Sequence, residues 1–324
     1  MGLIGIGGQG RIHLRNCLRL KKAKLIGVAD ISETSLKFAK KLGIRNVYKN
    51  YDDLLSNQQI DAVIISLPNF LHFESVTKAA EAGKDIFLEK PLARNVAEGR
   101  KILSNVKRNG VKLMLGYNMR FTTTLRKLHE KIADGFFGEV EIVQATNVSH
   151  GPFTPKGGIK TLRSVPSWWF NKDLAGGGAL LDLGSHLINL LSWYFGEVKN
   201  VESYLGYKFN MELEDSAICI LKFRTGPLAT INVGWFSKDL IQSIQICGTA
   251  KNLSMHLSPP SISHLIFRDI RRKLGIFKYD SYYTELKYFV ECLWNDASPS
   301  PSGEEGLSDL QVISMAYKHS HNLA

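Results

Sequence analysis

Short apolar runs alternate with segments of helical periodicity over the first 118 residues. Each run predicts a buried parallel strand, because a strand covered on both faces is hydrophobic along its whole length. Capping residues mark the helices between them, such as Asn69 and Gly83 around the helix predicted from His72 to Ala82. Strands are predicted within 1–6, 25–30, 46–48, 61–67, 86–91 and 111–118, and helices within 11–22, 32–42, 51–56, 72–82 and 95–108. The alternation predicts an α/β domain with a doubly wound parallel sheet over residues 1–118.

The alternation of strands and helices ends after residue 120, where strand-like runs follow one another without helices between them. Such an order is typical of a large, mostly antiparallel open sheet. We predict helices at 122–134, 179–195 and 304–318, and strands at 139–150, 198–207, 216–224, 228–236, 241–248 and 252–257. We therefore predict a second α/β domain over residues 119–324, whose last helix can pack back towards the first domain. The closing Lys318, His319 and His321 are predicted to be a frayed end.

The net charge of +11 narrows the classes of partner. All of the excess lies in residues 1–120, which hold 21 Lys and Arg against 10 Asp and Glu. These basic residues are dispersed along predicted helices and not interleaved with aromatic residues, so we expect no nucleic-acid binding. A basic cluster at 268–273 is interpreted as a solvated helix end. No apolar run approaches the ~18 residues of a membrane span, so no membrane association is expected.

The four cysteines indicate the compartment and argue against a metal. Cys17, Cys219, Cys247 and Cys292 are isolated, with no CxxC pair and no histidine at ligand spacing. This pattern predicts neither a zinc site nor a disulfide framework. It is typical of a protein in the reducing cytoplasm.

The first strand runs directly into a glycine motif. Gly5, Gly7 and Gly10 form G-x-G-x-x-G, which allows a tight turn, close approach of a pyrophosphate and close packing of helix on strand. Asp30 ends the second strand 20 residues after Gly10, where a carboxylate would bind a ribose 2′-hydroxyl. We predict that the dinucleotide is NAD, because Asp30 would repel the 2′-phosphate of NADP and neither residue 31 nor 32 is arginine. The predicted cofactor-binding residues of this region are Gly5, Gly7, Gly8, Gln9, Gly10, Arg11, Ile12 and Asp30.

Two further segments carry candidate chemistry. Glu89-Lys90-Pro91 closes an apolar strand, and ligands of open α/β sheets lie at such carboxyl ends. On the helix predicted at 179–195, Asp182 and His186 are four residues apart and therefore share a face. That face includes Asn189 and carries no lysine or glutamate, so we interpret it as lining a cleft. Histidine is the side chain best suited to exchange a proton near neutral pH.

These motifs together resemble the glucose–fructose oxidoreductase, inositol dehydrogenase and MocA family (Gfo/Idh/MocA). The matching segments are GIGGQG, VAD at 28–30, SLPNFLH at 66–72, AGKDIFLEKPLA at 82–93, GYNMRF at 116–121 and AGGGALLDLGSHLIN at 175–189. The resemblance implies a Rossmann domain that binds a nicotinamide dinucleotide, and a second domain whose open sheet packs against another subunit, giving a homodimer or homotetramer. It also implies a polyhydroxylated substrate such as a sugar or cyclitol.

The resemblance further implies roles for single residues. Lys90, Asp182 and His186 match the catalytic residues, and the Lys90–Pro91 bond is often cis in relatives. Arg120 and Trp168 match positions near the substrate. Those that match the surroundings of the ribose and nicotinamide are Ser66, Leu67, Pro68, Asn69, His72, Glu89, Lys90 and Asn118. Asn189 departs from the family, where aspartate is common, which leaves the substrate's identity open.

Three functions are compatible with these residues. The leading hypothesis is an NAD-dependent dehydrogenase in which His186 takes a hydroxyl proton and Lys90 stabilises the alkoxide. The first alternative is an NAD-dependent glycoside hydrolase, which would release sugar without net NADH. The second alternative is a sugar- or dinucleotide-sensing protein without activity. The presence of Lys90, Asp182 and His186 together argues against the sensing protein, because a protein that only binds would not need all three.

Overall fold

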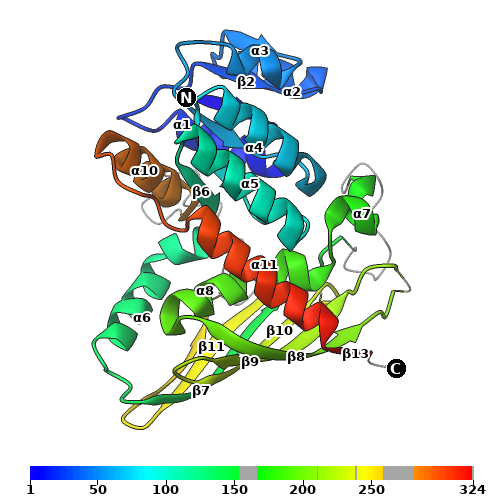
Figure 1. Cartoon of the computed structure of the whole chain (residues 1–324), viewed down its shortest axis with the longest axis vertical. Helices are drawn as coiled ribbons and strands as arrows, with labels where there is room; N and C mark the ends of the chain where they lie inside the picture. Colours follow the sequence, from blue (N-terminus) through cyan, green and yellow to red (C-terminus); the bar gives the residue numbers. More distant parts are fainter. Residues whose placement is uncertain (153–165, 210, 238, 258–280, 323–324) are drawn as a thin grey trace. The chain divides into compact units, whose positions relative to one another are not determined.

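The computed structural model describes residues 1–152, 166–209, 211–237, 239–257 and 281–322, and the predicted basic cluster at 268–273 lies outside them (Figure 1). The chain divides into two compact units. The first comprises Met1–Phe121 with Asp280–Leu310, and the second comprises Thr122–Tyr279 with Gln311–Ala324. We describe each unit by itself.

The first unit is built on a six-stranded sheet in the order β3-β2-β1-β4-β5-β6, and every neighbouring pair is parallel. The order reverses between β1 and β4, which is the switch point where open α/β sheets bind their ligands. The strands are β1 (Gly2–Ile4), β2 (Gly27–Ala29), β3 (Asn46–Tyr48), β4 (Ala62–Ile65), β5 (Asp85–Glu89) and β6 (Leu113–Gly116). The predicted doubly wound sheet is confirmed.

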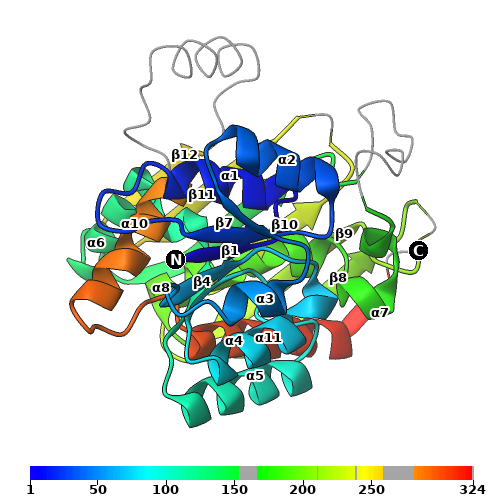
Figure 2. The same ribbon diagram turned by 90° about the horizontal axis from the view of Figure 1, so that it is seen from above.

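Helices cover both faces of this sheet. Figure 2 shows α1 and α2 on one side of β1 and β4, and α3, α4 and α5 on the other. The bounds are α1 (Gly8–Cys17), α2 (Glu33–Lys41), α3 (Tyr51–Leu55), α4 (His72–Glu81) and α5 (Val96–Asn109). Asn95 caps α5 as its position suggests. The predicted cap at Asn69 is wrong, because Asn69 begins a 3₁₀ turn (Asn69–Leu71) that leads into α4.

Helix α10 (Ser281–Trp294) also belongs to the first unit, where the sequence predicted no helix. Its buried Leu286, Phe289 and Val290 join the same hydrophobic core as Phe87 of β5 and Leu14 of α1. The first unit is therefore completed by residues far along the chain. This differs from the prediction of a second domain running without interruption from 119 to 324.

The second unit contains a seven-stranded sheet in the order β12-β11-β7-β10-β9-β8-β13. The pairs β7–β10 and β8–β13 are parallel and the others are antiparallel, so the expectation of a mostly antiparallel sheet is confirmed. Its strands are β7 (Val140–Val148), β8 (Val198–Gly206), β9 (Ser216–Phe223), β10 (Leu228–Gly234), β11 (Ile241–Gly248), β12 (Asn252–His256) and β13 (Ser320–Asn322). The chain end predicted to be frayed forms β13 in this sheet.

Residues of the second sheet alternate between its two faces, most regularly in β9. In β9, Ala217, Cys219, Leu221 and Phe223 are buried, whereas the residues between them are half-buried or exposed. We call the exposed side the open face. It carries the apolar side chains of Ile142, Tyr204, Ile218, Ile220 and Leu228, and also the thiol of Cys247.

The second unit's helices include α6 (Thr123–Ala133), α7 (Lys172–Ala175) and α8 (Ser185–Phe195), and α11 (Gly303–Lys318) is divided between the units. By length and composition, the helical stretch Lys172–Phe195 would suit a membrane span, although the sequence analysis predicts no membrane span. Its apolar window is 72% buried inside the protein, as expected of a core helix.

Candidate functional site

The three motif glycines occupy positions where a side chain would clash or would block a ligand. Gly5 has φ +88°, and a Cβ there would lie 2.3 Å from the Ser66 carbonyl oxygen. A Cβ on Gly10 would lie 2.0 Å from the Gly5 carbonyl oxygen, so helix α1 approaches β1 closely. A Cβ on Gly7 would meet nothing within 4 Å. The loop is thus tightly built on its inner side and open on its outer side.

This open side fits a dinucleotide phosphate. Helix α1 starts after Gly7 without a side-chain cap, so its first N–H groups are available to a phosphate. The Nε2 of Gln9 is buried and has no hydrogen-bond partner among the described residues. The exposed Arg11 lies with its guanidinium 4.9 Å from the ring centre of Phe38. The residues present therefore fit NAD.

Asp30 directly follows β2, and main-chain groups orient its carboxylate. Oδ2 accepts a hydrogen bond from Ile6 N at 2.6 Å, and Oδ1 accepts one from Ser32 N at 2.7 Å. Both oxygens retain a further lone pair for a sugar hydroxyl. The next side chain, Ile31, is 92% exposed. A carboxylate beside an apolar side chain suits the unphosphorylated ribose of NAD.

His72 has a different role from the one predicted. Its ring is fully buried, with Nδ1 2.8 Å from the Pro91 carbonyl oxygen and Nε2 3.0 Å from that of Leu67. Burial lowers the pKa of His72, and the two carbonyl contacts oppose that shift. The ring therefore links the segments that follow β4 and β5 instead of facing a cofactor. The half-buried Ser66, Leu67, Pro68 and Asn69 lie in the first of these segments.

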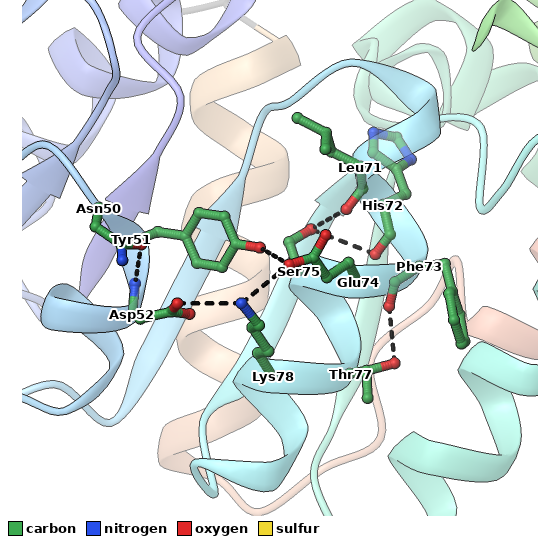
Figure 3. A network of polar contacts seen from close by, with 10 residues as sticks. All are labelled: Asn50, Tyr51, Asp52, Leu71, His72, Phe73, Glu74, Ser75, Thr77 and Lys78. Atoms are coloured by element: carbon green, nitrogen blue, oxygen red, sulfur yellow. Dashed lines mark hydrogen bonds and ion pairs between the residues drawn. The ribbon is translucent and has the colours of Figure 1, made fainter.

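Helix α4, which begins at His72, interacts with α3 through a network of ion pairs and hydrogen bonds (Figure 3). Lys78 Nζ lies 3.1 Å from Asp52 Oδ2 and 2.9 Å from Glu74, which also accepts a hydrogen bond from the Tyr51 hydroxyl at 3.0 Å. Burial and the Glu74 carboxylate raise the pKa of Tyr51 to about 12. Exposed ion pairs of this kind contribute at most ~1 kcal/mol each. The network steadies α4 but contains no catalytic group.

Glu89 turns into the first unit's core at the end of β5. It is buried, and its Oε1 lies 2.5 Å from His13 Nε2. Glu285 completes a cluster in which three potential metal ligands lie within 4.8 Å of one another, although the sequence predicted no metal site. The half-buried Lys90 follows, and the Lys90–Pro91 peptide is cis as the resemblance implies. Glu89 therefore has an internal partner, and its predicted contact with the cofactor stays a prediction.

Asn118 and Arg120 also have partners inside the first unit. Asn118 Nδ2 donates to Ser281 Oγ at 3.1 Å, and Arg120 Nη1 lies 2.5 Å from Glu305 Oε1. Burial acts to raise the pKa of Glu305, but the Arg120 charge and hydrogen bonds to the carboxylate outweigh it and lower that pKa. Arg120 is 5% exposed. These contacts support a structural role for Arg120, and its predicted contact with substrate stays a prediction.

In the second unit, the three consecutive glycines allow close packing before the site helix. Gly176 ends α7 with φ +86°. A Cβ on Gly177 would lie 2.3 Å from the Tyr317 hydroxyl, and one on Gly178 would lie 2.0 Å from the Glu214 carbonyl oxygen. Only glycine permits both approaches without displacing these groups.

Glu214 is a residue that the sequence reading missed. Its carboxylate is buried, and Oε1 accepts hydrogen bonds from Gly178 N, Leu180 N and the Tyr317 hydroxyl at 3.0, 3.0 and 2.8 Å. Burial raises the pKa of Glu214, and these hydrogen bonds oppose that shift. Glu214 thus caps the start of the helix that carries the candidate catalytic residues.

That helix begins with a π-helical turn (Leu180–Gly184) and continues as α8. π-turns are rare and occur frequently at functional sites. Asp182 lies within the turn and His186 just after it, and both are half-buried, whereas Asn189 is 1% exposed. Trp235 Nε1 donates to Asp182 Oδ2 at 3.3 Å.

The predicted substrate residue Trp168 belongs to a group of aromatic rings in the second unit. It is half-buried, and its ring centre lies 5.8 Å from that of Trp169. Trp169 in turn lies 6.0 Å from Trp235 between ring centres. The second unit therefore holds Asp182 and His186 on one irregular helix, with the indole of Trp235 in contact with Asp182.

Family comparisons agree with this geometry. Residues 1–117 match the model of the oxidoreductase family with an NAD-binding Rossmann fold, and residues 125–254 match the Gfo/Idh/MocA C-terminal domain. The chain belongs to the Gfo/Idh/MocA oxidoreductase family. It is an oxidoreductase, and its first unit is the NAD-binding domain.

Relatives cover almost the whole chain. A myo-inositol 2-dehydrogenase from Thermotoga maritima is 28% identical, and the alignment covers 94% of this chain and 91% of that protein. The scyllo-inositol dehydrogenase of Lactobacillus casei, solved with NAD(H) and scyllo-inositol, has a TM-score of 0.80 at 20% identity, covering 98% and 96%. The WlbA dehydrogenase of Bordetella pertussis, solved with NADH and UDP-GlcNAcA, has a TM-score of 0.83 at 23% identity, covering 98% and 94%. At these identities the two structures establish the fold.

Proposed function

We propose that this protein oxidises a secondary hydroxyl of a sugar or cyclitol, with the hydride passing to NAD⁺. The observation that carries the proposal is the position of the half-buried Asp182 and His186 on one helix at a π-turn, in a chain whose other unit is an NAD-binding domain. Relatives named as inositol dehydrogenases favour a polyhydroxylated ring.

Each candidate residue has one role in the proposed reaction. His186 accepts the hydroxyl proton as the hydride leaves the same carbon, which is general-base catalysis. Lys90 places a positive charge beside the oxygen and stabilises developing alkoxide. Asp182 orients the imidazole and stabilises the imidazolium that forms. Bound NAD⁺ supplies only the hydride acceptor.

The proposal is tested by NADH formation with a panel of cyclitols, aldoses, deoxysugars and nucleotide sugars. Turnover of any ring supports a dehydrogenase, and the same assay with NADP⁺ tests the preference assigned to Asp30. Release of sugar without net NADH would instead indicate the hydrolase. Tight NADH binding without either reaction would indicate a sensor.

Two substitutions test the residue roles. Lys90→Met and His186→Ala should each keep NADH binding and lower kcat by at least ~100-fold, because each removes a group that acts on the transferred proton or its oxygen. The exposed Lys199→Met and His256→Ala serve as matched controls. Near-full activity in either site variant would contradict the assignment.

We also propose that the open face associates with another copy of the chain. Leu228 lies directly beside Ile142 in the sheet register, and both are 49% exposed. A monomer rarely exposes a contiguous apolar patch of this kind without a partner. Ile142→Asp should reduce the molar mass in solution by light scattering, and an unchanged mass would argue against this interface. The cytoplasmic location remains a prediction from the unpaired cysteines.

A further inference from the structure

Trp235 contacts a candidate catalytic residue but was not among the predicted site residues. It directly follows β10 and is 2% exposed, one of the largest buried side chains of the protein. Its indole Nε1 donates to Asp182 Oδ2 at 3.3 Å. Because an indole can only donate, this nitrogen requires an acceptor when it is buried. Asp182 is that acceptor.

The orientation of the indole is determined from several sides. Its backbone N donates to the Asp215 carbonyl oxygen at 2.8 Å. A Cβ on Gly151, which has φ +54°, would lie 2.1 Å from Trp235 Cγ, so the chain passes closely over the ring. The ring centre of Trp169 lies 6.0 Å away. A ring packed in this way keeps its N–H direction, and the carboxylate must adjust to it.

The Asp215 side chain is itself held in place. Its Oδ2 accepts from Phe209 N at 2.8 Å and its Oδ1 from Ser216 Oγ at 3.2 Å. Asp215 is fully buried. The main chain that positions Trp235 is therefore anchored independently of Asp182 and His186.

We propose that Trp235 is a positioning residue that holds Asp182 for the reaction. The proposal rests on the function proposed above, and Trp235 itself touches neither substrate nor cofactor in it. The N–H bond fixes the direction of the carboxylate through Oδ2. A hydrogen bond to a carboxylate favours its ionised form, which is the form that stabilises an imidazolium.

Trp235→Phe tests this role, because it removes the N–H and keeps an aromatic ring. We expect kcat to fall about 10-fold with little change in KM, the effect of losing one hydrogen bond to a charged group. The acid limb of the pH–rate profile reports protonation of the base His186, and its midpoint should move to higher pH, because a carboxylate that has lost the indole donor attracts the imidazolium more strongly. In an Asp182→Asn background, Trp235→Phe should lower kcat no further.

Trp294→Phe is a matched control. Trp294 also donates its Nε1 to an oxygen, the Lys22 carbonyl at 2.8 Å, but lies on α10 in the first unit. The Trp294→Phe variant should keep the wild-type activity and the wild-type pH–rate profile. Urea unfolding of Trp235→Phe, Asp182→Asn and the double variant forms a double-mutant cycle. It measures the coupling energy of the Trp235–Asp182 contact and requires no activity assay. We expect a coupling of about 5-fold or more in the unfolding equilibrium constant.

The outcomes separate the two proposals. The positioning role would be overturned if Trp235→Phe lowered kcat equally in the wild-type and the Asp182→Asn protein. It would also be overturned if Trp235→Phe lowered only the stability and left the pH–rate profile unchanged. Absence of coupling in unfolding would overturn the contact itself. Full activity of Asp182→Asn would instead overturn the function assigned to Asp182, whatever Trp235 does.

Discussion

Replacing Glu214 by alanine should destabilise the protein strongly. The carboxylate is 3% exposed and accepts three hydrogen bonds, so alanine would leave Gly178 N, Leu180 N and the Tyr317 hydroxyl without their acceptor. Each buried donor left unsatisfied costs ~1–3 kcal/mol. Removal of a carboxylate whose burial is unfavourable offsets ~1–2 kcal/mol of that total. We expect the free energy of unfolding to fall by about 3 kcal/mol, a large part of the ~5–15 kcal/mol of a typical domain.

Urea unfolding followed by tryptophan fluorescence measures this loss. The neighbouring Glu212 is exposed, so Glu212→Ala should stay within ~0.5 kcal/mol of the wild type. Tyr317→Phe removes one donor together with its hydrogen bond and should cost about 1 kcal/mol. Activity should fall in Glu214→Ala even where the protein remains folded, because the helix with Asp182 loses its cap. A loss below ~1 kcal/mol in Glu214→Ala would refute this reasoning.

Three further predictions concern other parts of the chain. Gly10→Ala should abolish NADH binding in calorimetry, since its Cβ would lie 2.0 Å from the Gly5 carbonyl oxygen, and binding at wild-type affinity would contradict the loop geometry. The pKa of Glu214 is raised in the folded state, so the contribution of this carboxyl to the free energy of unfolding is complete below the unfolded pKa of 4.5 and is lost as the pH rises through the folded pKa. Glu214→Gln cannot titrate and should lack this decline of the unfolding free energy with pH. Parallel pH curves for the wild type and the variant would disprove the argument. Arg120→Met should lower the free energy of unfolding by about 2 kcal/mol, because it leaves Glu305 without its cation. A raised KM at unchanged stability would support substrate binding by Arg120 instead.

Local patterns in the sequence predicted the first unit's sheet well. Continuous apolar runs and glycines such as Gly83, which follows α4 with φ +67°, depend on neighbours within a few residues, and these signals are readable along the chain. Helix α10 was missed because its partners Phe87 and Leu14 are about 200 or more residues away. The strand β13 carries no local signal that separates it from a frayed end, because a three-residue strand is stabilised almost entirely by its pairing with β8.

The candidate site was predicted in part for the same reason. Asp182 and His186 share a helix face, and their spacing was visible. Glu214 and Trp235 reach this helix from 34 and 53 residues away, and a single buried polar residue leaves no periodic signal. His72 and Glu89 are predicted as cofactor contacts because they lie in segments that match the family's motifs. Their direction into the interior depends on packing that the sequence pattern does not record.

The thiol of Cys247 makes the open face accessible to chemical labelling. Burial raises the pKa of Cys17 and of Cys219 to about 12, and Cys292 is buried as well. Since the thiolate is the reactive form, a maleimide dye should attach at Cys247 alone. Cys247 pairs with Ile142 in the sheet register. A dye at this position would report subunit exchange by energy transfer, and attachment would be slowed wherever two copies cover the face.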